Sequence, residues 1–167
     1  SDWSRAKRTI QKSVNEVCNE GGEVWVAKGL FTENVALLPY VCLYGGFAGT
    51  ETARQDRDWR TNTTIVDPGE QYGTVVTAFG IADNIHLIDG FTIRNGSGMQ
   101  YLSPSSFRAY GGGLFCLYSN TIISNNIIES NGRISTNYGG GICCVGSHPR
   151  ITSNIIRNNT AQSGGGI

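Results

Sequence analysis

One segment of this sequence occurs twice, and it decides the fold class. The first copy reads GGGLFC at residues 111–116 and ISNNIIESN at 123–131; the second reads GGGICC at 139–144 and ITSNIIRNN at 151–159. A third copy opens with GGGI at 164–167, so the copies start at Gly111, Gly139 and Gly164. Self-similarity at a nearly constant spacing is typical of repeat proteins, in which equivalent residues of successive units stack.

Each unit has the composition of short strands and turns. Its apolar runs are short and β-branched, and Gly, Asn and Ser separate them. A unit of about 22–28 residues with two or three strands is one coil of a β-solenoid, and asparagine suits its bends and can form amide ladders. With coils about 4.8 Å apart, four inward ladders are expected: Leu114/Ile142/Ile167, Cys116/Cys144, Ile123/Ile151 and Ile93/Ile128/Ile156.

The N-terminal segment has a different period. Trp3, Ala6, Ile10, Val14 and Val17 recur at helical spacing, and glycines at 21–22 end the run. We expect a helix over 2–20 with Asp2 as its N-cap, covering the open end of the solenoid. The predicted organisation is a cap over residues 1–22 and a solenoid over 23–167.

These motifs resemble the right-handed parallel β-helix family, the pectate-lyase-like superfold, and its secreted bacterial members of unassigned function in particular. The residues that carry the resemblance are GGEVWVAKGLFTEN at 21–34, LYGGF at 43–47, DGFTI at 89–93 and the GGG units. The resemblance implies an all-β, right-handed parallel β-helix of about six coils. Complete members have more coils and a C-terminal cover, so we expect this chain to be truncated or open at its C-terminal edge.

Composition excludes two classes of partner. The chain has 13 Lys+Arg and 13 Asp+Glu among 167 residues, so its formal net charge is zero. A surface that binds nucleic acid through bulk charge is therefore not expected. No apolar run approaches the roughly 20 residues of a membrane-spanning helix, so we expect no membrane insertion.

The resemblance also implies a place for chemistry, because enzymes of this family use carboxylates on one exposed sheet, for calcium binding in lyases or as acid and base in hydrolases. Asp67 and Asp89 are the candidates for catalysis and for metal binding, with Arg94, or else Arg108, as a cationic base. If the stretch from Asp67 to Asp89 spans one coil, the two carboxylates stack about 5 Å apart. The alternative, which we favour, is that both are turn residues, because Pro68-Gly69 and Gly90 follow them.

A long loop is the candidate binding segment. The stretch 98–110 is about twice as long as the equivalent linkers 132–138 and 160–163. It contains Tyr101, Phe107, Arg108 and Tyr110, a combination that suits stacking on sugar rings. The alternative is that these aromatic residues fold back over the outer face of the solenoid.

Two further groups of residues have ordinary explanations. The charged stretch 51–60 around Trp59 is typical of a solvated loop with local ion pairs. The five cysteines form no Cys-x-x-Cys motif, and Cys116 and Cys144 are expected to be buried, stacked thiols. The expected separation of their Cα atoms would also permit a disulfide.

The leading functional hypothesis is a secreted or cell-surface module without catalysis, which serves as a stalk, an adhesin or a surface that contacts a polysaccharide or cell-surface glycan. A second hypothesis is a fragment of a polysaccharide lyase or glycoside hydrolase that uses Asp67 and Asp89. A third is a homo-oligomer that stacks end to end through the unfinished strand at 164–167. No cofactor is expected, and calcium enters only under the lyase hypothesis.

Overall fold

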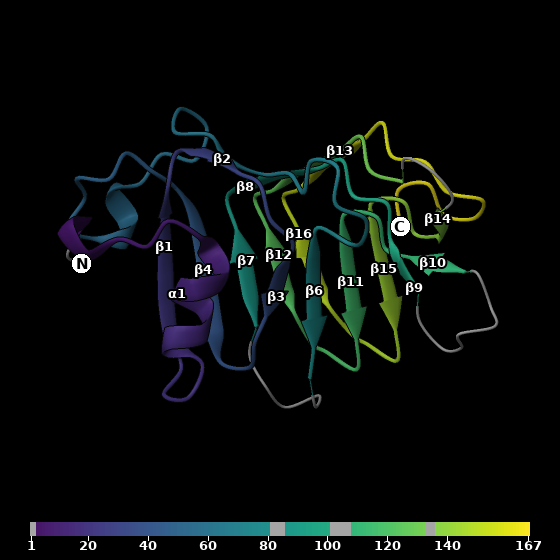
Figure 1. Cartoon of the computed structure of the whole chain (residues 1–167), viewed down its shortest axis with the longest axis horizontal. Coiled ribbons are helices and arrows are strands. Elements are labelled where there is room, and N and C mark those ends of the chain that lie inside the picture. The colour runs from purple at the N-terminus through teal and green to yellow at the C-terminus, as the bar shows by residue number, and fades with distance from the viewer. Residues whose placement is uncertain (1–2, 81–85, 101–107, 133–135) are drawn as a thin grey trace.

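The computed structural model describes residues 3–80, 86–100, 108–132 and 136–167. The chain is mostly β-structure, with the α-helix at its N-terminal end and parallel sheets that run along the length of the molecule (Figure 1). The predicted predominance of β-structure with parallel sheets is confirmed.

Three parallel sheets form the body. The first contains β1 (Gly22–Ala27), β4 (Val41–Phe47), β7 (Leu87–Asp89), β12 (Ile122–Ser124) and β16 (Arg150–Thr152). The second contains β2 (Gly29–Phe31), β5 (Thr64–Val66), β8 (Phe91–Arg94), β13 (Ile127–Glu129) and β17 (Ile155–Arg157). The third contains β3 (Val35–Leu37), β6 (Val76–Phe79), β11 (Leu114–Leu117) and β15 (Ile142–Val145).

The chain visits these sheets in the same order each time, which is compatible with an all-β parallel solenoid. Among the described residues it passes through the first sheet five times, against about six predicted coils. A fourth, smaller sheet lies beside the third (Figure 1) and pairs β10 (Ala109–Tyr110) with β9 (Met99–Gln100) and β14 (Thr136–Tyr138).

The predicted ladders are confirmed by the strand register. Leu114 pairs with Ile142 and Cys116 with Cys144, Ile123 pairs with Ile151, and Ile128 lies between Ile93 and Ile156. Most of these side chains belong to one continuous buried core. Ile167 lies beyond the last strand, where the backbone of Ile142 donates to the carbonyl of Gly166. Alternation of inward and outward residues along each strand therefore decides which strand side chains face outward.

Glycine triplets are required where successive repeats approach most closely. The first glycine of each triplet (Gly111, Gly139 and Gly164) has a φ between 59° and 65°. In the first two triplets each amide donates to a carbonyl of the next repeat, as Gly113 does to Gly140 at 3.1 Å. A Cβ on Gly141 would lie 2.5 Å from the carbonyl oxygen of Gly166.

Asparagines form the predicted amide ladders. Asn126 donates from Nδ2 to Asn154 Oδ1 at 3.1 Å, and Asn131 donates to Asn159 Oδ1 at 3.0 Å. Each rung also accepts a backbone N–H, as Asn126 Oδ1 does from Phe91 at 3.0 Å. The predicted left-handed bends occur beside these rungs, at Asn95, Asn125, Ser130, Ser153 and Asn158.

The cap is shorter than predicted. The α-helix α1 runs over Ile10–Val17, after a 3₁₀ turn η1 at Trp3–Arg5. Its N-cap is Thr9, and the carboxylate of Glu33 accepts the amides of Ile10 and of its neighbour at position 11. The helix therefore begins where these acceptors meet its free N–H groups. Asp2, the predicted N-cap, lies outside the described residues.

The cap does bury an apolar face. Ile10 and Val14 are buried in the core against β1 and β3. Within the part of the chain that the structure describes, no helix has the length and apolar character that crossing a bilayer requires.

The cysteines are free thiols among the described residues. Cys116 is fully buried, as predicted, whereas Cys144 is only partly buried. The hydrogen bond to the Cys144 thiol, together with burial, raises the pKa of Cys116 well above its ordinary value.

Candidate functional site

The two candidate acids are not stacked, because the stretch between them does not span one coil. The favoured alternative, a turn residue, holds for Asp67. Asp89 ends β7 in the first sheet, where its paired residues are Tyr44 and Ser124. Asp67 follows β5 in the second sheet, where Val66 pairs with Ile93 of β8. The separation of the two acids along the chain is thus no period of the fold. The chain between the two acids leads from the second sheet in one repeat to the first sheet in the next repeat.

Asp67 lies in a turn that holds its carboxylate. Its Oδ1 accepts the amide of Gly69 at 2.9 Å, which is the Asx turn that Pro68-Gly69 predicted. Its Oδ2 accepts from Arg94 Nε at 2.9 Å and from Asn95 Nδ2 at 2.8 Å. Burial by itself raises the pKa of Asp67. The three hydrogen-bond donors together lower it by more, so the pKa lies below the ordinary value. The guanidinium of Arg94 is engaged in an ion pair here, not placed as a base.

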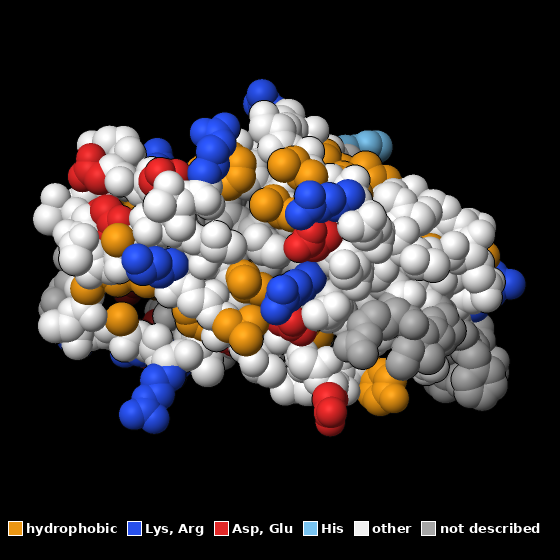
Figure 2. Space-filling view, turned by 90° about the horizontal axis from the view of Figure 1, so that it is seen from above, with side chains coloured by type: hydrophobic (Ala, Val, Ile, Leu, Met, Phe, Trp, Pro, Cys, Tyr) orange, Lys and Arg blue, Asp and Glu red, His pale blue; other side chains and the backbone are white. Residues whose placement is uncertain are grey.

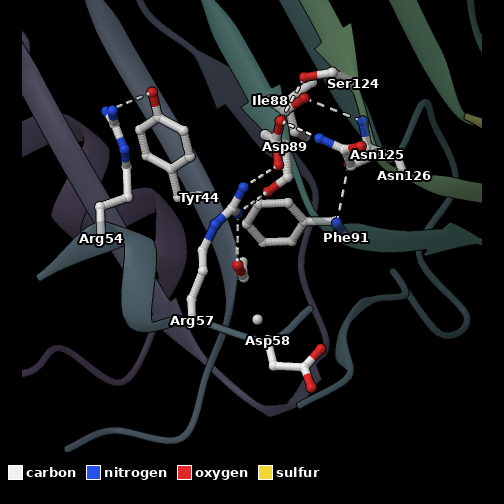
Figure 3. A network of polar contacts seen from close by, with 12 residues as sticks. Tyr44, Arg54, Arg57, Asp58, Ile88, Asp89, Phe91, Ser124, Asn125 and Asn126 are labelled. Atoms are coloured by element: carbon white, nitrogen blue, oxygen red, sulfur yellow. Dashed lines mark hydrogen bonds and ion pairs between the residues drawn. The ribbon is translucent and has the colours of Figure 1, made fainter. Parts of the chain in front are cut away.

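Asp89 is the centre of a denser network, shown in Figure 3. Its Oδ1 forms an ion pair with Arg57, and its Oδ2 accepts from Ser124 Oγ and from Asn125 Nδ2. The Asp89 and Arg57 side chains are only 8% and 13% exposed. Arg57 also donates to the carbonyl oxygen of Gly45 at 2.9 Å. Both carboxylate oxygens of Asp89 are therefore occupied by donors.

The loop that delivers Arg57 was predicted to be solvated, and for this residue the prediction is wrong. The guanidinium of Arg57 reaches the carboxylate of Asp89 on β7, and it lies 5.1 Å from the ring centroid of Tyr44. Asp58 does behave as predicted, because it is exposed and bonds locally to Thr61 at 2.7 Å. The loop adheres to the first sheet because Gly46 and Gly90 leave room for it: a Cβ on Gly46 would lie 2.4 Å from Trp59 Cα.

Neither acid is arranged for calcium. The carboxylates belong to different sheets, and each already accepts an arginine and further N–H or O–H donors. A calcium site needs six to eight oxygen ligands around one point. Among the described residues, no group of three or more His, Cys, Asp or Glu side chains is placed to hold a metal ion. The residues present do not fit this cation.

The described part of the long loop forms an aromatic stack on the fourth sheet. The ring of Tyr110 lies 5.2 Å from that of Tyr138, at an interplanar angle of 22°. Arg108 Nη1 donates to the Tyr138 hydroxyl at 3.2 Å, with the guanidinium carbon 5.8 Å from the ring centroid. Tyr110 also stacks on the buried Phe115, so its other side meets the body of the protein. Tyr101 and Phe107 lie outside the described residues.

Amide side chains continue this surface toward the last repeat. Asn137, from the same strand as Tyr138, accepts the amide of Ala109 at 2.7 Å and donates to Gln162 Oε1 at 3.0 Å. We call Arg108, Tyr110, Asn137, Tyr138 and Gln162 the tyrosine surface. It combines flat rings with hydrogen-bonding amides, one on β14 and one in the segment after β17.

Sequence reasoning missed Tyr138 and Arg57. Tyr138 had a signal, because it directly precedes Gly139 just as Tyr110 precedes Gly111. Two residues at one repeat position are expected to stack. Arg57 had no comparable signal, since its contact with Asp89 depends on how a non-repeating loop folds over the sheet.

Comparisons with known proteins add no relative. No family model matches this chain, and no matching curated protein or solved structure was found. The functional argument therefore depends on the geometry of the chain itself.

Proposed function

We propose that this chain is a right-handed parallel β-helix module, secreted or displayed at a cell surface, that contacts carbohydrate and does not catalyse a reaction. The fixed order in which the chain visits its three parallel sheets supports the β-helix. In such a fold, outward side chains form rows at intervals of about 4.8 Å.

The observation that carries the proposal is the tyrosine surface. Tyr138 presents an aromatic ring with a polar hydroxyl, Tyr110 supports it by stacking between Tyr138 and Phe115, and Asn137 and Gln162 supply amide groups beside it. Sugar rings have apolar faces and hydroxyl rims, so they bind by stacking on rings and by hydrogen bonding at the edge. Arg108 adds a positive charge, which favours glycans that contain carboxylate groups.

The state of the acids supports a role without catalysis. A glycosidase needs two carboxyl groups on either side of one bond, and a general base must be able to reach its proton. Asp67 and Asp89 lie in separate sheets and accept arginine N–H groups. Their contacts instead fix the turn after β5 and the loop over the first sheet.

The test begins with a glycan array that includes uronate polymers, followed by affinity measurement on the strongest ligand. Tyr138→Ala is expected to weaken binding about fivefold, because stacking on an aromatic ring contributes roughly 1 kcal/mol. Tyr40→Ala, at an exposed tyrosine near the cap, is the matched control and should leave affinity unchanged. Equal affinities for the wild type and Tyr138→Ala would contradict the proposal.

A second measurement addresses catalysis. The protein is incubated with pectin and alginate, with and without calcium, and the absorbance of unsaturated products is followed. No product is expected. Product formation that Asp67→Asn or Asp89→Asn abolishes would replace the proposal with the lyase hypothesis.

A further inference from the structure

A cavity of about 460 Å³ lies between the cap and β1, at the opposite end of the molecule from the tyrosine surface. The molecule is hollowed beside hydrophobic side chains at this end in Figure 2. The body of the cavity is apolar and includes three aromatic residues and several aliphatic ones: Trp3, Ala6, Ile10, Val17, Val24, Trp25, Val26 and Phe31. Its volume lies within the roughly 300–1,000 Å³ of small-molecule sites.

The roof of this cavity is held in place on several sides. At one end of α1, Glu33 accepts the amides of Ile10 and Gln11 at 2.8 and 3.0 Å. The Gln11 side chain accepts the amide of Ala36 at 2.7 Å and donates to its carbonyl at 3.2 Å. On the far side, Trp3 Nε1 donates to the carbonyl of Glu51 at 2.9 Å. These contacts fix the position of the cap, which packs on β1 through Ile10 and Val14, so the space beside them is preformed.

The charged residues at the rim of the cavity indicate the charge that a ligand would carry. Lys7 pairs with Glu16 at 2.9 Å across the cap. Glu23 pairs with Arg54 and accepts Trp25 Nε1 at 2.8 Å. Among the described residues that line the cavity, Arg5 is the charged side chain that has no ion-pair partner. A guanidinium binds a carboxylate through two parallel hydrogen bonds.

We propose that this cap cavity binds an aryl carboxylate, with the aromatic body among Trp3, Trp25 and Phe31 and the carboxylate at Arg5. The aromatic walls favour an aryl body because ring pairs add attraction beyond the area that they bury. The site is independent of the tyrosine surface.

Calorimetric titration of the full chain with 2-naphthoate tests this, with the neutral 2-naphthamide as a matched probe. Both are expected to bind, and the carboxylate more tightly. Arg5→Gln is expected to weaken naphthoate binding about tenfold, the effect of one charged hydrogen-bonded contact, and to leave naphthamide within about twofold. Emission from the wild-type tryptophans should change on binding, because Trp3 and Trp25 line the cavity.

Filling the cavity provides the second arm. Ser13→Phe places a ring into the space and is expected to abolish binding of both probes, whereas Lys12→Phe, exposed on the same helix, should not. Ala6→Leu is a smaller filling variant for use if Ser13→Phe does not fold. No naphthoate binding by the wild type, equal weakening of both probes by Arg5→Gln, or full binding by a folded filling variant would overturn the proposal. Tyr138→Ala should leave naphthoate affinity unchanged, which separates this result from the glycan test.

Discussion

The repeats after Gly111 and those before Gly96 build the same sheets by different means. In the later repeats the register is constant, because the pairs Leu114–Ile142, Ile123–Ile151 and Ile128–Ile156 all have the same separation in sequence. In the earlier part of the first sheet, Val24 pairs with Leu43, whereas Leu43 pairs with Ile88, which lies more than twice as far along the chain. The length of chain between paired positions is therefore free to vary, whereas the strand pairing is not.

The corner between the first and second sheets is held by different side chains in the regular and in the irregular repeats. Asn126 bridges neighbouring repeats by donating to the carbonyl of Ile88 at 3.0 Å and to Asn154. At the equivalent corner of an earlier repeat, the buried Thr64 hydroxyl accepts the amide of Gly46 at 2.9 Å. A ladder requires identical residues only where each side chain bonds to a copy of itself. Where a loop intervenes, any side chain that satisfies the backbone is sufficient.

The largest difference is expected from removing these corner side chains. Asn126→Leu leaves the Phe91 amide and the Ile88 carbonyl without these partners in a buried site and removes one donor from Asn154, at a cost of about 4 kcal/mol in the free energy of unfolding. Thr64→Val removes the acceptor of the Gly46 amide and one hydroxyl proton that the carbonyls of Val26 and Ala27 share at the long distances of 3.4 and 3.3 Å, and it should cost about 2 kcal/mol. Urea unfolding measures both; equal losses would mean that the two corners are held alike.

Next in size is the effect of the two carboxylates. Asp89→Ala leaves the nearly buried guanidinium of Arg57 without its ion pair and is expected to destabilise by about 3 kcal/mol. Asp67→Ala, whose partner Arg94 is 35% exposed, should cost about 1 kcal/mol because solvent screens that pair. Chemical denaturation of both variants beside Asp89→Asn, which keeps acceptor capacity, gives the comparison. A larger loss for Asp67→Ala would contradict the assignment of Asp89 as the main clamp.

A smaller effect is expected within the glycine triplets, where one repeat provides the control for another. Gly141→Ala places a Cβ 2.5 Å from the Gly166 carbonyl oxygen and should destabilise by about 2 kcal/mol. At the equivalent Gly166, a Cβ would meet only Ile156, at 3.7 Å, so Gly166→Ala should change stability by less than about 0.5 kcal/mol. Thermal unfolding of both variants checks this. Similar unfolding midpoints for the two variants would show that the close approach of successive repeats does not require glycine in the triplet.

The smallest expected effect is a pH dependence at the junction of the two regions. Burial lowers the pKa of His86, whose Nδ1 lies 2.8 Å from Ser119 Oγ. Below the unfolded-state pKa of about 6.5, the unfolded chain binds more protons than the folded one, so stability falls as pH decreases through that value. His86→Gln should flatten the stability profile between about pH 5 and 7. His148→Gln, at an exposed histidine, is the control; an unchanged slope in His86→Gln would refute the assignment.

The candidate site was predictable only where it repeats. The position of Tyr138 in its unit matches that of Tyr110, so stacking along a ladder brings the two rings together. Stacking of Asp67 and Asp89 required that one coil separate them, whereas inserted loops make the true register uneven. The turn at Asp67 was predicted correctly, since it depends only on Asp67 and the Pro68-Gly69 pair that follows it.

By itself, the sequence determined the strand-rich class, the inward ladders and the asparagine rungs. These follow from alternation and from side chains that bond to their own copies, and both are local or periodic. Only the tertiary structure decided that Arg57 clamps Asp89, that Glu33 caps α1 and that a cavity remains under the cap. Those features join residues that are neither neighbours in sequence nor related by the repeat, and packing alone brings them together.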